Sequence, residues 1–305
     1  MENIILETNG LCKKYKNTYA LDNVSLKLYK NHIYGFIGEN GAGKSTFMKI
    51  VSGLAFPTSG EFTLMGEHTP AEVEKKRRKV GTMIEQPALY PNYSIRQNVE
   101  LQRIVVGNPD ASATDRVIEM VGLTDDKNKK AKNLSMGMKQ RLGIAIAMVG
   151  DPKFLILDEP INGLDPKNIV SLRKLLKKLN EEYDVTIFIS SHILSELYLL
   201  ATDYIFIHKG RIIETATHQV LEEKCSQYIS IKTDNIPETV TLIEKSFPDV
   251  EYKVMSDDAI KVFAKPEIRT EISRLIMEAG IVISELSVKE QTLEEYFMSI
   301  TGGER

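Results

Sequence analysis

The chain has 305 residues, of which 42% are hydrophobic and 27% are charged. This composition is ordinary for a soluble globular protein, and the length exceeds the roughly 100–200 residues of a typical domain, so we expect two domains. The sequence shows neither a secretory leader nor an apolar run of the ~18 residues that a spanning helix needs. We therefore expect a cytosolic chain with no membrane span of its own.

The charge is distributed unevenly along the chain. Residues 226–305 carry nine Lys and Arg against fifteen Asp and Glu, a balance of −6, whereas residues 1–225 carry thirty against twenty-seven, a balance of +3. We therefore predict two domains, 1–224 and 225–305, and the acidic end argues against a basic tail that binds nucleic acid. We expect Cys12 and Cys225 to be reduced thiols that contribute to packing.

A glycine-rich stretch, residues 38–46 (GENGAGKST), follows three short strand-like runs at 4–8, 24–28 and 32–37. It fits the phosphate-binding pattern G-x-x-x-x-G-K-[ST], and a helical pattern follows it, as this pattern requires. Glycines let backbone N–H groups face phosphate oxygens, the lysine reaches the β- and γ-phosphates, and the serine hydroxyl ligates Mg²⁺. The candidate ATP-binding residues here are Gly38, Asn40, Gly41, Gly43, Lys44, Ser45 and Thr46.

Four further residues are candidates because of the elements in which they lie. Tyr15 precedes the loop, where its ring could stack on an adenine face or simply pack on the sheet. Gln86 follows a predicted strand at 80–84, at the kind of strand end where open α/β sheets bind ligands. From about 88 to 150 the hydrophobic period is helical, which predicts a helical insert whose last helix starts near Ser135 and Gly137. These two residues form either an anion site or an ordinary helix cap.

Two buried-strand patterns end in residues suited to catalysis. The run at 154–159 ends in Asp158 and Glu159, which suit holding Mg²⁺ and polarising the attacking water, respectively. Asp165 lies in the turn that leads into a long helix. The next strand, 185–190, is followed by His192, a candidate sensor of the γ-phosphate.

In this order the motifs resemble those of the ATP-binding subunits of ABC transporters, over about residues 4–220. The resemblance implies an α/β fold with a P-loop (RecA-like) ATPase core, an N-terminal antiparallel β part and the helical insert. It also implies a homodimer enclosing two ATP molecules, with Ser135 and Gly137 of one subunit on the γ-phosphate held by the other. Finally, the resemblance implies that Tyr15 contacts adenine and that Gln86 contacts Mg²⁺ and the membrane permease. It also implies that Asp165 acts across the dimer and that His192 lies at the γ-phosphate.

The chain departs from the family pattern in one motif. The usual Leu-Ser-Gly-Gly-Gln reads LSMGM at residues 134–138, so Met136 and Met138 replace a glycine and the glutamine. Because Ser135 and Gly137 are retained, we expect activity to survive. Residues 84–91 and 134–141 look more particularly like bacterial exporter ATPases that protect against bacitracin and lantibiotic peptides.

The C-terminal segment predicts a small α+β domain of order β-α-β-β-α-β. The expected elements are strands at 228–233, 251–255, 259–264 and 282–288 and helices at 237–247 and 268–279. Asp257 and Asp258 suit a hairpin between the middle strands, and Gly280 suits a helix C-cap. Residues 292–302 predict a terminal helix with an apolar stripe. The fold hosts many functions, so a structural and a ligand-sensing role both stay open.

These patterns support one leading function and two alternatives. The leading hypothesis is an ATP hydrolase with ATP and Mg²⁺, bound to permease subunits at the inner face of the membrane and driving export of antimicrobial peptides. One alternative is a soluble ABC ATPase that acts outside transport. The other is a transporter ATPase regulated by a ligand-sensing C-terminal domain.

Overall fold

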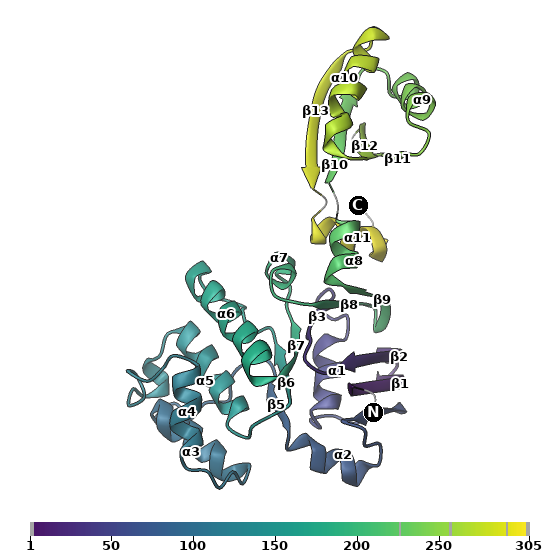
Figure 1. Cartoon of the computed structure of the whole chain (residues 1–305). Helices are drawn as coiled ribbons and strands as arrows, with labels where there is room; N and C mark the ends of the chain where they lie inside the picture. The colour runs from purple at the N-terminus through teal and green to yellow at the C-terminus, as the bar shows by residue number, and fades with distance from the viewer. Residues whose placement is uncertain (1–2, 226, 256–257, 291, 303–305) are drawn as a thin grey trace. The chain divides into compact units, whose positions relative to one another are not determined.

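The computed structural model describes residues 3–225, 227–255, 258–290 and 292–302 (Figure 1). Packing divides the chain into two units, Met1–His218 and Gln219–Arg305. The sequence predicts the division after residue 224. The structure instead assigns residues 219–224, which form most of one short helix, to the second unit. Within the described ranges, no helix combines the length and the apolar character needed to cross a bilayer.

A six-stranded sheet forms the centre of the first unit, with strand order β5-β6-β7-β3-β8-β9. All of its neighbouring strands run parallel except β8 and β9. Every residue of β3, β6 and β7 is buried, as expected for parallel strands covered on both faces. The strands are β3 (Ile33–Ile37), β5 (Val80–Met83), β6 (Phe154–Asp158), β7 (Thr186–Ser190), β8 (Asp203–His208) and β9 (Arg211–Thr217).

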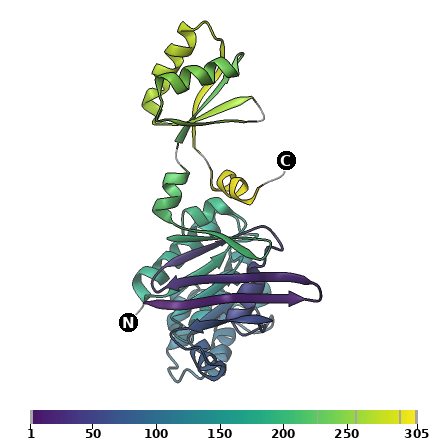
Figure 2. The same ribbon diagram turned by 90° about the vertical axis from the view of Figure 1, so that its right-hand side faces the viewer.

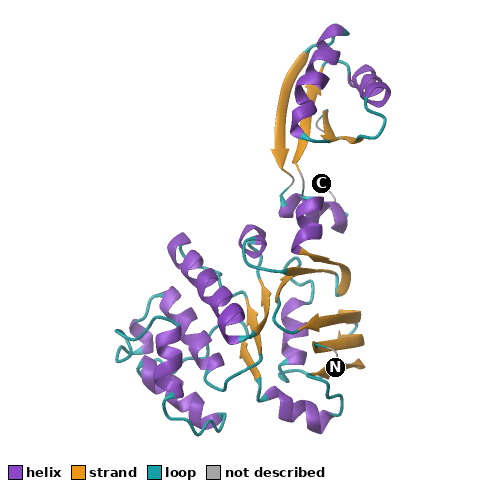
Figure 3. Ribbon diagram, viewed as in Figure 1, coloured by secondary structure: helices purple, strands orange, loops and turns teal. Residues whose placement is uncertain are grey.

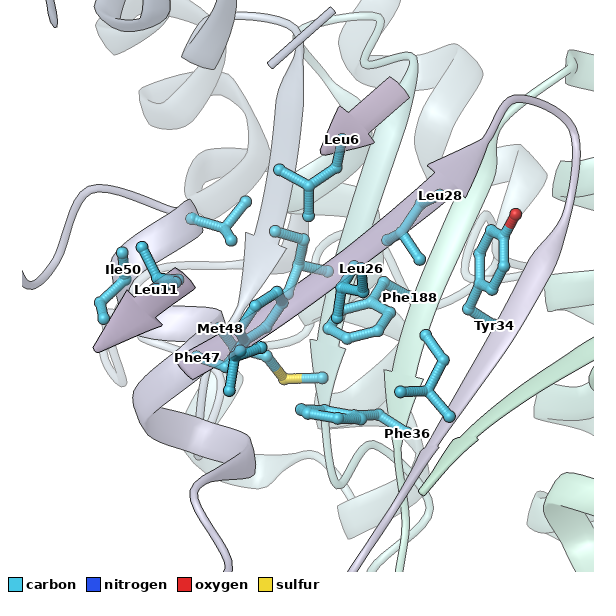
Figure 4. Close-up of a cluster of buried hydrophobic side chains, with 14 of the residues drawn as sticks. Leu6, Leu11, Leu26, Leu28, Tyr34, Phe36, Phe47, Met48, Ile50 and Phe188 are labelled. Atoms are coloured by element: carbon cyan, nitrogen blue, oxygen red, sulfur yellow. The ribbon is translucent and has the colours of Figure 1, made fainter. Parts of the chain in front are cut away.

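A second, antiparallel sheet has the order β2-β1-β4, formed by β1 (Ile4–Tyr15), β2 (Thr18–Tyr29) and β4 (Ser59–Leu64) (Figure 2). The predicted strands at 4–8 and 24–28 were too short. They continue into one long hairpin, because Lys16 adopts a left-handed φ of 53° that closes a tight turn. Leu6, Leu28, Phe47 and Phe188 belong to one buried cluster that joins this hairpin to the parallel sheet (Figure 4).

Helices surround the parallel sheet of the first unit (Figure 3). The insert contains α3, α4 and α5, and the buried Asn98 side chain bonds the backbone of Tyr90, Tyr93 and Ser94 to the first of them. The helices of the first unit are α1 (Lys44–Val51), α2 (Pro70–Arg77), α3 (Ile95–Val105), α4 (Ala113–Met120), η1 (Ala131–Asn133), α5 (Met136–Met148), α6 (Pro166–Tyr183) and α7 (Leu194–Tyr198).

The second unit contains a four-stranded antiparallel sheet of order β11-β12-β10-β13. Ile229, Ile231, Ile260 and Val262 line its inner face, together with Ile272 and other residues of its two larger helices. Its elements are α8 (His218–Lys224), β10 (Gln227–Thr233), α9 (Ile236–Ser246), β11 (Glu251–Val254), β12 (Ala259–Phe263), η2 (Pro266–Ile268), α10 (Arg269–Glu278), β13 (Ile283–Glu290) and α11 (Leu293–Thr301).

The predicted β-α-β-β-α-β order is therefore present in this unit, with each boundary within two residues of the expected one. Gly280 follows α10 with a φ of 75°, the left-handed conformation that suits a residue just past a helix end. Of the expected hairpin pair, Asp258 adopts a φ of 61°, while Asp257 lies outside the described residues. The α/β fold class is confirmed.

Candidate functional site

The glycine-rich loop joins the end of β3 to the start of α1, and two of its glycines are required by close packing. A Cβ at Gly38 would lie 2.5 Å from the carbonyl oxygen of Ile207, and one at Gly43 would lie 2.5 Å from that of Ala20. Gly43 also has a φ of 112°, which side-chain-bearing residues rarely adopt. Glycine at these two positions therefore lets the loop pack closely against the backbone of β8 and β2.

This loop bounds a cavity of about 180 Å³. Six of the seven predicted loop residues line it, with Gly38 as the exception, and Glu159 contributes from the end of β6, which β7 separates from β3 in the sheet. The lining residues are Ala20, Glu39, Asn40, Gly41, Gly43, Lys44, Ser45, Thr46 and Glu159.

Lys44 is the buried cation of this cavity. Its Nζ donates hydrogen bonds to the carbonyl oxygens of Gly38 (2.5 Å) and Glu39 (3.2 Å). Burial lowers the pKa of Lys44, and the carboxylates of Glu159 and Asp158 act in the opposite direction. An incompletely compensated ammonium in a cavity lined by backbone N–H groups is a site for an anion.

Asp158 and Glu159 stand at the end of β6, and Ser190 at the end of β7 connects them. The Ser190 hydroxyl donates to Asp158 Oδ1 (2.6 Å) and accepts from the backbone N–H of Glu159 (2.9 Å). Asp158 is 2% exposed, and Ser190 is fully buried. The pairing of β6 with β7 brings these residues together, because Asp158 and Ser190 are register partners.

Glu159 and His192 form the second contact between these strand ends. The Glu159 carboxylate accepts a hydrogen bond from the backbone N–H of His192 (3.2 Å), and His192 Nδ1 lies 2.7 Å from the same oxygen. Glu159 has a φ of 51°, uncommon for a residue with a side chain. Backbone strain of this kind persists where surrounding interactions hold the residue in place, and strained residues are enriched at functional sites.

Gln86 and Tyr15 lie outside the residues that line this cavity. Gln86 is exposed, just beyond β5, and its neighbour Glu85 pairs with Lys49 of α1 at 2.7 Å. Tyr15 is 51% exposed, with the Lys13 ammonium 5.0 Å from its ring centroid. The assigned contacts of Gln86 with Mg²⁺ and of Tyr15 with adenine therefore stay predictions.

Ser135, Gly137 and Asp165 begin two helices that pack together, and they do not line the cavity of their own chain. The exposed Ser135 caps α5 by accepting from the backbone N–H of Met138 (3.3 Å). Asp165 caps α6 by accepting from the backbone and side-chain amides of Asn168 (2.9 and 2.7 Å). Those two bonds from Asn168 lower the pKa of Asp165.

Ser190 is the site residue that the sequence analysis missed. It is the last residue of a predicted buried strand, adjacent in the sheet to the strand that ends in two carboxylates. A hydroxyl at the end of an otherwise apolar strand could have indicated it. The adjacency of the two strands, however, only becomes visible in the folded chain.

The chain is similar in sequence to known proteins. A family model described as ABC transporter matches residues 21–162. The bacitracin transport ATP-binding protein BcrA of Bacillus licheniformis is 36% identical over 299 residues, covering 98% of this chain and 98% of that protein. The lantibiotic transport ATP-binding protein SrtF of Streptococcus pyogenes is 42% identical over 209 residues, covering 68% of this chain and 89% of that protein.

Solved structures are also similar. A dimeric ATP-binding cassette in a post-hydrolysis state, bound to ADP and Pi, has a TM-score of 0.65 at 28% identity and covers 70% of this chain and 99% of its own. A cbiO1 protein from Clostridium perfringens, part of an ABC transporter complex, has a TM-score of 0.66 at 26% identity and covers 81% of this chain and 97% of its own.

Proposed function

Because the chain belongs to the family of ABC transporter ATP-binding proteins, we propose that it powers a separate membrane permease that exports antimicrobial peptides of the bacitracin or lantibiotic kind. The chain is an ATP hydrolase. The names of its relatives support the transport role and the peptide class. We place the protein on the cytoplasmic face of the membrane, held there by the permease.

The structural observation behind the proposed ATPase mechanism is the contact between Glu159 and His192, because Glu159 also lines the cavity that contains Lys44. Bound ATP would place its phosphates against the loop N–H groups and draw the Lys44 ammonium away from the carbonyls of Gly38 and Glu39. Glu159 would accept a proton from the attacking water, and His192 would hold that carboxylate in place. Water attacks the γ-phosphorus, the bond to the bridging oxygen breaks, and ADP and phosphate leave.

The chemistry of three oxygen-bearing side chains fits Mg²⁺. Ser45 lines the cavity and would supply a hydroxyl, whereas Asp158 and Gln86 lie outside its lining and would add a carboxylate and an amide oxygen. Oxygen ligands of these kinds are the ones that this hard cation prefers. Among the described residues, no group of three or more His, Cys, Asp or Glu side chains could hold a metal alone. That agrees with the ion's habit of binding between one or two carboxylates and the substrate phosphates. Bound there, Mg²⁺ would neutralise charge on the β- and γ-phosphates.

We further propose that two copies form the working enzyme. The similar solved cassettes include dimers. Ser135, Gly137 and Asp165 would complete the site of the second copy, since they do not line the cavity of their own chain. The permease would contact the insert near Gln86, where the exposed Tyr90 and Tyr93 rings stack at 5.4 Å. Exposed apolar surface of this kind suits a protein partner.

The substitution Glu159→Gln tests the catalytic assignment. The amide cannot accept the water's proton, so we expect ATP binding to persist, hydrolysis to fall by at least about 100-fold, and an ATP-stabilised dimer to appear on size exclusion. Glu182→Gln, an exposed position near the end of α6, is the matched control and should behave as wild type. Hydrolysis near the wild-type rate in Glu159→Gln would exclude Glu159 as the base.

The transport assignment needs its own measurement. Expression of the chain with its permease should raise bacitracin or lantibiotic resistance of a sensitive host, and Glu159→Gln should abolish that gain. An active ATPase that confers resistance to neither peptide class would exclude the proposed cargo.

A further inference from the structure

Strand β13 forms one edge of the four-stranded sheet in the second unit, and it pairs only with β10 among the described strands. Its apolar residues are incompletely covered. Leu286 and Val288 are only half-buried, whereas their register partners Ile231 and Ile229 on β10 are fully buried. An edge strand offers unpaired backbone N–H and C=O groups to another strand. The β13 edge is therefore a surface that can still accept backbone hydrogen bonds and cover apolar side chains.

The sequence of this edge is self-complementary. Residues 285–289 read Glu-Leu-Ser-Val-Lys, with opposite charges at the two ends, aliphatic residues next to them, and Ser287 at the centre. An antiparallel copy centred on Ser287 would place Glu285 opposite Lys289 and Leu286 opposite Val288. Opposite charges and aliphatic pairs facing each other across strands are both stabilising.

A groove adjoins the same edge on the helix side of the sheet. It has a volume of about 500 Å³, and a stripe of α10 forms one wall while Leu286 of β13 contributes the strand residue. Figure 1 shows α10 beside β13. Met277 in this groove is 66% exposed. The lining residues are Arg269, Thr270, Ser273, Arg274, Met277, Glu278 and Leu286.

We propose that β13 pairs with β13 of a second copy of this chain, in antiparallel register about Ser287. The pairing joins the two four-stranded sheets into one sheet of eight strands across a two-fold axis. On the helix side, Val288 of the second copy covers Leu286 and enters the groove.

The charges on the face of the sheet that lies away from the helices favour a second copy of the chain over an unrelated strand as the partner of β13. Within one chain, Glu285 and Lys289 already pair at 2.7 Å, with 38% and 45% of their side chains exposed. In the dimer, Glu285 of each copy pairs with Lys289 of the other copy. The two ion pairs within the chains are thus replaced by two ion pairs across the interface. A strand that lacks an acidic and a basic residue at this spacing would leave one of these charges without an opposite charge.

Disulfide trapping tests the register. In full-length protein carrying Lys44→Ala, Cys12→Ser and Cys225→Ser, without nucleotide, Ser287→Cys places two thiols opposite each other at the axis. Their Cα atoms would fall within the ~4.4–6.8 Å that a disulfide needs. The matched control, Ser284→Cys, puts the two thiols six residues apart in register, about 20 Å. We expect cross-linking at 287 to exceed that at 284 by at least about tenfold.

A charge exchange tests the complementarity in the Ser287→Cys background. Lys289→Glu sets Glu285 against a second glutamate, and we expect the cross-linking rate to fall about fivefold or more. Adding Glu285→Lys restores opposite charges and should restore the rate. Thermal unfolding of each variant checks that the fold is intact.

Equal cross-linking at 284 and 287, no cross-linking at either, or loss without recovery in the double exchange would each overturn the proposal. Because the experiment uses a chain impaired in nucleotide binding, its result does not depend on the ATPase assignment.

Discussion

Ser190 is the residue that fixes the geometry of Asp158 and Glu159, the two carboxylates that we propose for Mg²⁺ binding and catalysis. It donates to Asp158 and accepts from the backbone of Glu159, and the latter residue has a left-handed φ. A hydrogen bond to a buried carboxylate contributes about 1.5–3 kcal/mol. Ser190 thus acts through Asp158 and Glu159, as a positioning residue.

We expect Ser190→Ala to lower the ATP hydrolysis rate by about tenfold or more while changing ATP affinity little. The physical reason is that a misplaced Glu159 loses about 1.4 kcal/mol of transition-state stabilisation per tenfold in rate. Steady-state kinetics separate the rate constant from the KM. Ser190→Thr keeps the hydroxyl and should recover most of the rate; equal losses in both variants would indicate a packing effect instead.

At the scale of elements, α5 and α6 are joined through Gly137. A Cβ at Gly137 would lie 2.7 Å from the side chain of Asn168, and that side chain holds Asp165 at the start of α6. Arg141 adds a hydrogen bond to Ser171 of α6 (2.8 Å). Gly137 therefore has a packing role inside its own chain in addition to the proposed contact with ATP on a second copy.

The packing role predicts that Gly137→Ala destabilises the chain by about 1–3 kcal/mol, the usual cost of an overpacked site. Asn168→Ala should remove the clash, so the double variant should be less destabilised than the sum of the single variants. Urea unfolding of the three variants measures this coupling. Strict additivity of the two effects would show that Gly137 and Asn168 do not interact.

At the scale of the whole molecule, the proposed dimer divides each ATP site between two chains. Lys44 would bind ATP from one side, and Ser135 and Gly137 of the second copy from the other. A Lys44→Ala chain retains an intact Ser135 side, and a Ser135→Arg chain retains an intact Lys44 side. Each variant lacks one half that the other supplies.

We therefore expect neither variant to hydrolyse ATP alone and a one-to-one mixture to recover about a quarter of the wild-type rate. Half of the dimers would be mixed, and each would contain one intact site. The coupled-enzyme rate of the mixture is the measurement. If mixed dimers form with ATP but remain inactive, the shared-site arrangement or the independence of the two sites is wrong.

Pairing through β13 would also serve the proposed ATP-dependent dimer. Two chains already joined at their second units present their ATPase units to each other at a high effective concentration. ATP-dependent closure then becomes a step within one assembly. The pairing offers a function for this acidic unit, none of whose described residues lines the ATP cavity.

Local sequence patterns predicted the candidate reactive groups and most of the order of the elements. The glycine-rich loop, the strand ending in Asp158 and Glu159, and His192 were predicted because each depends on local spacing: glycine where the backbone turns sharply, and carboxylates after an apolar run. The βαββαβ order of the second unit was predicted for the same reason, since periods of two and 3.6 residues can be read from neighbouring positions.

The contacts between residues that are distant in the sequence depend on the folded arrangement of the strands. The Glu159–His192 contact joins residues separated by 33 positions, and the Ser190 bridge depends on β6 lying beside β7. The long β1–β2 hairpin and the β13 edge likewise follow from strand pairing. Pairing is chosen by the packing of all strands and helices together, so no local pattern specifies it. The sequence therefore supplied the reactive groups, and the sheet order placed them in contact.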